Sequence, residues 1–232
     1  MERSFVLRQR RETTLLAKEG SRSKDKAGQY QSELFIRPTG LSADFQQQLV
    51  TELTPLTGEG FLREDKHAQQ LMDDVANHIL DCDRLTVIRQ KDETIAFVAA
   101  SIVEHDEKIF YHLEGIIIHP DFHGSGIAID VLKKDMAASG AHYLAFHTQS
   151  SRMLGLGKKL ADINPQDSAR FAGLIGTCNQ VGVIDKGRYG GHSLYEDEEK
   201  FAATAIEDID WRSGDAMICI GPIKKNGRTD TR

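Results

Sequence analysis

Hydrophobic and polar residues alternate most regularly in the middle of the chain. Three stretches rich in β-branched and aromatic residues follow one another there: RLTVIRQ from Arg84, TIAFVAASIVEH from Thr94 and IFYHLEGIII from Ile109. The charged breaks KDE and HDEK separate them, and short polar breaks between apolar runs are typical of hairpin turns. The pattern therefore predicts an antiparallel meander of three strands.

Apolar residues at helical spacing predict helices on both sides of this meander. Ser42 has the side chain of a helix N-cap, so one helix is expected after it. Residues 56–63 are typical of a turn-rich connection, and a second helix is expected over 64–80. Beyond the meander, one helix is expected to end near Gly140 and another to cover 150–163. The supporting apolar positions are Phe45, Leu49, Leu53, Leu71, Val75, Ile79, Ile127, Val131, Leu132 and Met136.

The rest of the chain predicts one domain with additions. Residues 1–30 mix Arg, Lys, Ser and Glu with few apolar anchors, which is typical of a mobile basic arm. The domain is expected over 31–222, with further strands at SELFIRP, HYLAFHT and AMICIGP. A glycine-rich insertion of about 164–211 precedes the last strand, and connections of such length are usually functional or disordered. A disordered tail is expected over 223–232.

Composition narrows the class of protein. The chain has 232 residues, 40% of them hydrophobic, and a formal net charge of -6, which argues against nucleic-acid or membrane partners. No apolar stretch approaches the roughly 20 residues that span a bilayer, so a cytoplasmic protein is expected. Cys82, Cys178 and Cys219 are few and far apart, so we expect buried thiols and no disulfides. The nine histidines lack close ligand spacing, so no metal site is expected.

The segment IIIHPDFHGSGIAIDVLKK, residues 116–134, changes from a strand pattern to a helix pattern at a glycine turn. Backbone N–H groups at a helix start have no partner within the helix, and the helix dipole adds about half a positive charge. Gly124 and Gly126 would let a phosphate approach them closely. Ile129 stands where a dinucleotide fingerprint needs its third glycine, and no P-loop string occurs. A phosphate site is thus weighed against an ordinary turn.

With this loop the chain resembles the GCN5-related N-acetyltransferase (GNAT) superfamily, whose acyl-CoA motif is Arg or Gln, two free positions, Gly, one free position, then Gly or Ala. The lead-in to the loop is Ile118, His119 and Pro120, and the loop positions are His123, Gly124, Ser125, Gly126, Ile127 and Ala128. His123 departs from the motif, which puts one phosphate contact in doubt. The order of predicted elements over residues 33–163 agrees with the family as well.

The resemblance implies a fold, a cofactor and a reaction. The fold would be an α/β one with a mixed, mostly antiparallel central sheet, splayed strands and flanking helices. Acetyl-CoA would be the co-substrate, with its pyrophosphate on the loop and its pantetheine arm paired with the backbone of Ile116, Ile117 and Ile118. The reaction would be direct transfer of the acyl group to an amine-bearing acceptor, a small molecule or a protein. Whether the chain forms a homodimer stays open.

Strand alternation predicts that His112, Glu114 and Ile116 share one face. Glu114 stands where several family members carry the general base, and desolvation in a groove would raise the pKa of its carboxyl group. A structural Glu, bonded to a backbone amide or an Arg, is the equal alternative. His112 is the substitute base.

The family resemblance leaves the general acid unassigned. Ser150 falls where the family has a pantetheine-binding Asn, and Gly157 falls where it has a Tyr donor. Ser150 can still donate one hydrogen bond, whereas Gly157 cannot donate a proton. Tyr189 or Tyr195 of the insertion would then protonate the leaving thiolate, or both would simply pack or bind the acceptor. A non-catalytic acyl-CoA-binding module is therefore the rival hypothesis.

Overall fold

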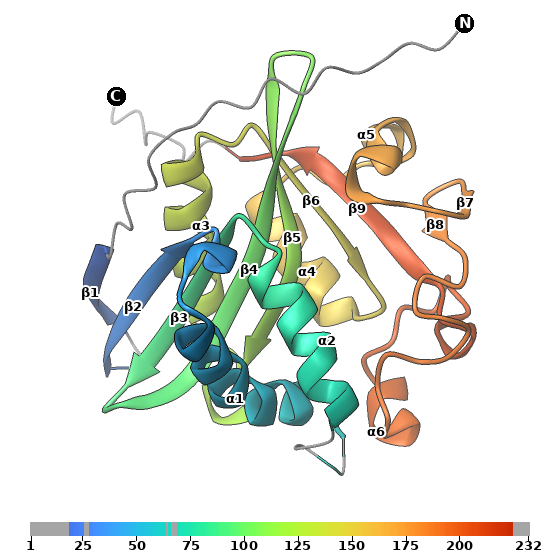
Figure 1. The fold of residues 1–232 in the computed structure, drawn as a ribbon. Helices are drawn as coiled ribbons and strands as arrows, with labels where there is room; N and C mark the ends of the chain where they lie inside the picture. Colours follow the sequence, from blue (N-terminus) through green and yellow to red (C-terminus); the bar gives the residue numbers. More distant parts are fainter. Residues whose placement is uncertain (1–18, 26–27, 64, 66–68, 225–232) are drawn as a thin grey trace, which may run out of the picture.

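The computed structural model describes residues 19–25, 28–63, 65 and 69–224. These residues form a nine-stranded sheet in the order β1-β2-β3-β4-β5-β6-β9-β8-β7 (Figure 1). Only β5 and β6 pair in parallel, which confirms the predicted mixed, mostly antiparallel sheet. The strands are β1 (Glu19–Asp25), β2 (Gly28–Ile36), β3 (Arg84–Gln90), β4 (Glu93–His105), β5 (Lys108–Ile118), β6 (Tyr143–Thr148), β7 (Gln180–Val181), β8 (Ile184–Asp185) and β9 (Ala216–Pro222).

The predicted meander is confirmed as β3, β4 and β5, which pair in sequence order. Its turns have positive backbone φ at both central residues: 50° and 68° at Lys91 and Asp92, and 47° and 61° at Asp106 and Glu107. A two-residue turn with positive φ at both positions has a backbone twist that matches the right-handed twist of the two strands it connects. The charged breaks in the sequence are therefore tight hairpin turns.

Helices cover both faces of the sheet, with α1 and α2 on one face and α3 and α4 on the other (Figure 1). The side chains of Leu53 on α1, Ile79 on α2 and Leu85 on β3 are fully buried between these helices and the sheet. Burying one such side chain stabilises the fold by about 1.5–3 kcal/mol. On the other face, Leu132 of α3 and Leu144 of β6 are fully buried. The helices are α1 (Ala43–Gly60), α2 (Gln69–Leu80), α3 (Ile127–Ser139), α4 (Ser151–Leu160), α5 (Pro165–Phe171) and α6 (Glu198–Ala202).

Two predicted helix boundaries were wrong. Ser42 is the N-cap of α1, as predicted, but the helix continues to Gly60 through the expected connection. The buried side chains of Leu56 and Thr57 extend its apolar face, and the Thr57 hydroxyl donates to the Leu53 carbonyl. The second helix is described over Gln69–Leu80, and Asp65, within its expected range, is not helical.

The sheet also extends beyond the expected domain limits. Strand β1 pairs with β2 along its whole length, so residues 19–25 and 28–30 of the expected arm belong to strands. At the other end, the Lys224 N–H donates to the Leu160 carbonyl, which holds the first residues of the expected tail. The remaining parts of the arm (1–18) and tail (225–232) lie outside the described residues.

The insertion, residues 164–211, contains α5, the β7–β8 hairpin and α6. The hairpin adds two short strands to the sheet edge formed by β9. The insertion therefore continues the sheet beyond β9, while its helix α6 lies away from the hairpin, near the lower edge of Figure 1. Within the described ranges, no helix combines the length and the apolar character needed to cross a membrane.

Candidate functional site

Strands β5 and β6 separate in the middle of the sheet. They pair only from Phe110 to His112 on β5, and β6 continues alone along β9 to Thr148. On its other side, β5 stays paired with β4 as far as Ile118. A cavity of about 1100 Å³ lies in the gap. The predicted splay of these strands is confirmed.

A β-bulge interrupts β5 at Glu114. Ala99 pairs with Gly115 and Ala100 with Leu113, so Glu114 is the extra residue. A bulge of one residue reverses the alternation of side chains beyond it. Ile116 consequently packs with Leu113 in the core under α3 and α4. The predicted single face of His112, Glu114 and Ile116 was wrong for this reason.

Glu114 lines the cavity and accepts a hydrogen bond from the Ser101 hydroxyl of β4. Ser101 pairs with His112 across the strands, so these three side chains belong to one patch of the sheet. Burial, and then the charge of Glu114, raises the pKa of the Cys82 thiol to about 12. The carboxylate of Glu114 therefore sits beside a thiol that stays protonated and inert at neutral pH.

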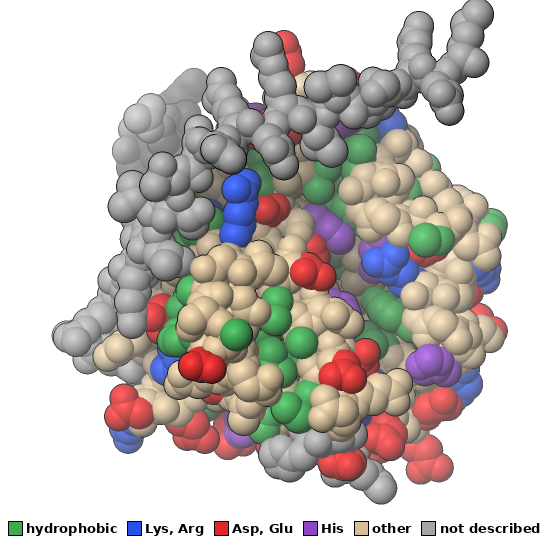
Figure 2. All heavy atoms as spheres, in the orientation of Figure 1, with side chains coloured by type: hydrophobic (Ala, Val, Ile, Leu, Met, Phe, Trp, Pro, Cys, Tyr) green, Lys and Arg blue, Asp and Glu red, His purple; other side chains and the backbone are tan. Residues whose placement is uncertain are grey.

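His112 does not line the cavity but faces His147 of β6, with 6.4 Å between the ring centroids. Burial, and then the charge of Arg188, lowers the pKa of His112 to about 4; the same two causes lower that of His147 to about 3. His147 lies 3.0 Å from the Thr177 hydroxyl and 3.5 Å from the buried Asp185 carboxylate. Figure 2 shows histidine side chains in a hollow between the α1–α2 layer and the insertion.

His147 was not predicted from the sequence. Its position one strand away from His112 depends on the parallel pairing of β5 with β6, which joins residues more than 30 positions apart. Because both imidazoles are uncharged at neutral pH, each can accept a hydrogen bond or a proton.

The glycine loop leads from β5 into α3 as predicted. The backbone φ is 76° at Gly124 and 93° at Gly126, and a Cβ at either position would meet no atom within 4 Å. In the described part of the chain, the N–H groups of Gly124, Gly126, Ala128 and Ile129 have no backbone or side-chain partner. Unpaired N–H groups at a helix start, with open space before them, fit an anion such as a pyrophosphate.

The loop residues contribute unequally to this geometry. His123 and Gly124 line the cavity, whereas Ser125, Gly126, Ile127 and Ala128 lie just beyond it. The Ile127 side chain is buried in the core, so only its backbone faces the loop, where the Ser125 hydroxyl accepts from its N–H. The His123 ring Nε2 lies 2.9 Å from the Ile118 carbonyl, which ties this side chain to the end of β5.

Ser150, at the position of the family's pantetheine-binding Asn, is the N-cap of α4: its hydroxyl accepts from the Met153 N–H, and the residue lines the cavity. The position matched to the family Tyr has no room for a side chain. A Cβ on Gly157 would lie 2.3 Å from the Phe146 ring of β6. Phe146, which lines the cavity, therefore fills the space beside Gly157.

Tyr189 and Tyr195 both line the cavity. Burial raises the pKa of Tyr195 to about 12, against the opposing charge of Arg152, and burial also raises the pKa of Tyr189. Tyr195 stacks on Phe201 with 3.7 Å between ring centroids and meets Phe61 of α1 edge-on. Both hydroxyl groups stay protonated at neutral pH and can donate.

Gln149, between β6 and α4, is a second residue that the sequence did not reveal. Its side chain is 1% exposed, donates to the carbonyls of Trp211 and Asp215, and accepts from the Leu194 N–H. An amide that satisfies three distant backbone groups gives no sequence signal, because its partners are more than 40 positions away. Gln149 fixes the insertion against the cavity.

The mouth of the cavity is surrounded by contacts between four segments. His119, just before the loop, lies 3.2 Å from the Glu59 carboxylate of α1. The Phe61 carbonyl at the end of α1 accepts from the Glu196 N–H of the insertion. Ser151 of α4 donates through its N–H and its hydroxyl to the Thr204 carbonyl. The loop, α1, the insertion and α4 thus form a ring, which we call the mouth.

The sequence was compared with models of known protein families and with curated protein sequences. The model of the acetyltransferase (GNAT) family matches residues 47–153, from α1 to the first turn of α4. No curated protein sequence matches the chain.

Solved structures of similar fold include acetyltransferases. The ribosomal-protein-S18-alanine N-acetyltransferase of Escherichia coli is 16% identical over 85% of this chain and 97% of its own, with a TM-score of 0.44. The IAA acetyltransferase of Bacillus cereus is 15% identical over 82% and 99%, with a TM-score of 0.42. A GNAT family acetyltransferase of Elizabethkingia anophelis with acetyl-CoA bound is 12% identical over 82% and 97%, with a TM-score of 0.41.

The matched segment contains the parts that the sequence had indicated: the meander, the splayed strand, and the glycine loop at the start of α3. The mixed sheet and the helices on its two faces follow the expected element order. Residues 47–153 of this chain therefore match the acetyltransferase (GNAT) family, as the sequence resemblance implied.

Proposed function

We propose that this protein transfers an acetyl group from acetyl-CoA to an amine acceptor, by direct attack within a ternary complex. One observation carries the proposal. The loop with unpaired N–H groups and the carboxylate of Glu114 lie on one continuous strand and loop, and both border the same cavity. If the loop held the pyrophosphate of CoA, the arm attached to it would therefore extend along β5 toward Glu114.

Each side of the cavity has a proposed role in cofactor binding. The unpaired amides of the loop hold the pyrophosphate, and the backbone of β5 pairs with the pantetheine arm as a short strand would. Ser150, at the opposite side, donates a hydrogen bond to the arm. The proposed cofactor-binding residues are Ile116, Ile117, Ile118, His123, Gly124, Ser125, Gly126, Ile127, Ala128 and Ser150.

Acetyl-CoA supplies the acetyl group as a thioester. As the acceptor nitrogen bonds to the acyl carbon and the carbon–sulfur bond breaks, Glu114 takes a proton from the amine. The hydrogen bond from Ser101 orients the carboxylate, and His112 is the second candidate base. Tyr189 or Tyr195 donates a proton to the departing sulfur, since burial keeps both phenols protonated.

A second function is favoured by one observation. The Phe146 ring fills the space beside Gly157, so the family's usual proton donor has no equivalent on α4. A protein that binds acyl-CoA without turning it over would need no such donor. The two functions share the cofactor site and differ in thiol release.

Calorimetry with acetyl-CoA tests both functions, because failure to bind at millimolar cofactor would contradict each of them. Release of free thiol in the presence of a panel of small amines and N-terminal peptides then separates them. We expect Glu114→Gln combined with His112→Gln to lower the rate of thiol release about 100-fold or more, with little change in cofactor affinity. A double variant that releases thiol at the unaltered rate would refute the proposed bases.

A further inference from the structure

Three cationic side chains line the cavity: Arg63, Arg152 and Lys200. Arg63 lies 4.0 Å from the carboxylate of Asp74 on α2. In the part of the chain that the structure describes, the side chains of Arg152 and Lys200 have neither an ion-pair nor a hydrogen-bond partner. Because no carboxylate among the described residues pairs with Arg152 or Lys200, both charges at the cavity are free to contact an anionic ligand.

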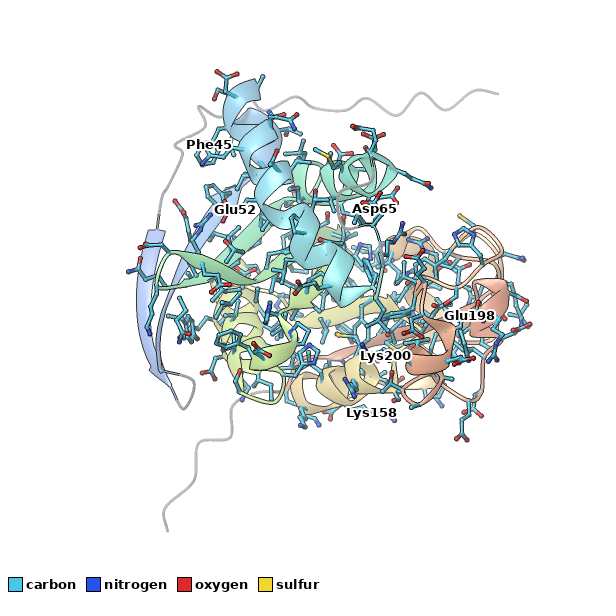
Figure 3. The ribbon with its side chains drawn as sticks, turned by 90° about the horizontal axis from the view of Figure 1, so that it is seen from below. Phe45, Glu52, Asp65, Lys158, Glu198 and Lys200 are labelled. Carbon is cyan, nitrogen blue, oxygen red and sulfur yellow. The ribbon has the colours of Figure 1, made fainter. Side chains whose placement is uncertain are left out.

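The fold holds Arg152 and Lys200 on the same wall. Arg152 lies in the first turn of α4 and Lys200 in α6, and Figure 3 shows Lys200 beside α4. The Ser151 N–H and hydroxyl donate to the Thr204 carbonyl at 2.8 and 2.9 Å, just past α6. The Ile206 N–H donates to the Gln149 carbonyl at 2.9 Å. These contacts hold the end of α6 against the start of α4.

This wall and the glycine loop border the same cavity. The loop side is fixed to the end of α1 by His119 and Glu59, and the end of α1 is fixed to the insertion by Phe61 and Glu196. Both sides therefore lie at the level where α1 ends. The loop offers N–H dipoles, and the Nε2 atom of its His123 ring lies 2.9 Å from the Ile118 carbonyl.

We infer that Arg152 and Lys200 form a second phosphate-binding wall that contacts the pyrophosphate of CoA from the side opposite the loop. The inference rests on the proposed function. It assigns to the insertion a role in cofactor binding: Lys200 reaches the mouth only because the insertion returns to α4. The two side chains supply the positive charge that an Arg would have provided at position 123.

Calorimetric titrations test this inference with three probes: CoA, dephospho-CoA and acetyl-pantetheine. We expect Arg152→Gln and Lys200→Gln each to weaken CoA binding roughly tenfold, and the double variant about 100-fold. The affinity for dephospho-CoA should fall by the same factor in these variants, because this probe keeps the pyrophosphate. The affinity for acetyl-pantetheine, which lacks the pyrophosphate, should not change. Raising the salt concentration should weaken binding to the unaltered protein more than binding to the double variant.

Lys158→Gln is the matched control, since Lys158 lies on α4 but does not line the cavity (Figure 3). It should bind all three probes as the unaltered protein does. Equal CoA affinity in the double variant and the unaltered protein would overturn the inference, as would a loss confined to CoA, which would place the 3′-phosphate at this wall. An increase only in the KM of the amine would also overturn it, because the wall would then bind the acceptor. Failure of the unaltered protein to bind CoA would instead contradict the proposed function.

Discussion

The two walls of the cavity differ in how the chain builds them. One wall comes from a continuous stretch, residues 113–124, in which a bulged strand runs into the glycine loop. The other wall combines the end of β6, the start of α4 and parts of the insertion, segments up to 60 residues apart. Local backbone preferences determine the first wall, whereas long-range hydrogen bonds such as those of Gln149 determine the second. Mutations should therefore act locally on the first wall and through folding on the second.

The largest effect is expected where the first wall ends, from Gly126→Glu in the glycine loop. Its φ of 93° disfavours any side chain, and the new carboxylate would repel a phosphate at the loop. We expect at least about a 1000-fold loss of CoA affinity by calorimetry, with the protein still folded. Gly126→Ala is the control, because a Cβ there meets no atom within 4 Å; backbone strain alone should cost about tenfold. Unchanged binding by a folded Gly126→Glu variant would refute the loop site.

A smaller effect, on folding, is expected at the second wall from Gln149→Leu. The substitution keeps the buried volume but leaves three backbone groups without partners, at a cost of about 3 kcal/mol in unfolding free energy. Urea denaturation and the rate of proteolysis within the insertion measure it. Gln180→Leu is the control, because this exposed side chain also bonds two carbonyls but water can replace it. If the two variants unfold alike, Gln149 does not support the wall.

The smallest effect concerns two buried histidines, His147 on the second wall and His112 on β5 beside it. Their folded-state pKa values, about 4 for His112 and about 3 for His147, lie below the 6.5 of an exposed imidazole. Unfolding therefore takes up protons below pH 6.5, so stability is full above that pH and is lost as the pH falls toward 4. Each histidine changes the unfolding free energy by at most about 1.4 kcal/mol per pH unit in this range. His112→Gln should reduce the slope between pH 6 and 4.5, measured by urea denaturation; an identical slope would contradict the assignment.

The difference between the walls also explains which features of the structure could be predicted from the sequence. The meander, the N-cap of α1, the glycine loop and the helix after it follow from local patterns, and the structure confirms them. The bulge at Glu114 does not, because it depends on how β4 and β5 pair rather than on any local signal. Arg152, His147 and Gln149 gain their significance only from contacts made by distant segments.

The mouth has a consequence for the rates of ligand exchange. The insertion is fastened to α4 by the two bonds from Ser151 and by the bond from Ile206 to Gln149. Among the described residues, one backbone hydrogen bond, from Glu196 to Phe61, joins it to the end of α1. We expect thermal opening to begin on the α1 side, with the fastened side as the hinge. A product enclosed beneath the Phe61–Tyr195 contact would leave only during such openings. The frequency of opening, rather than the strength of any cofactor contact, would then limit turnover.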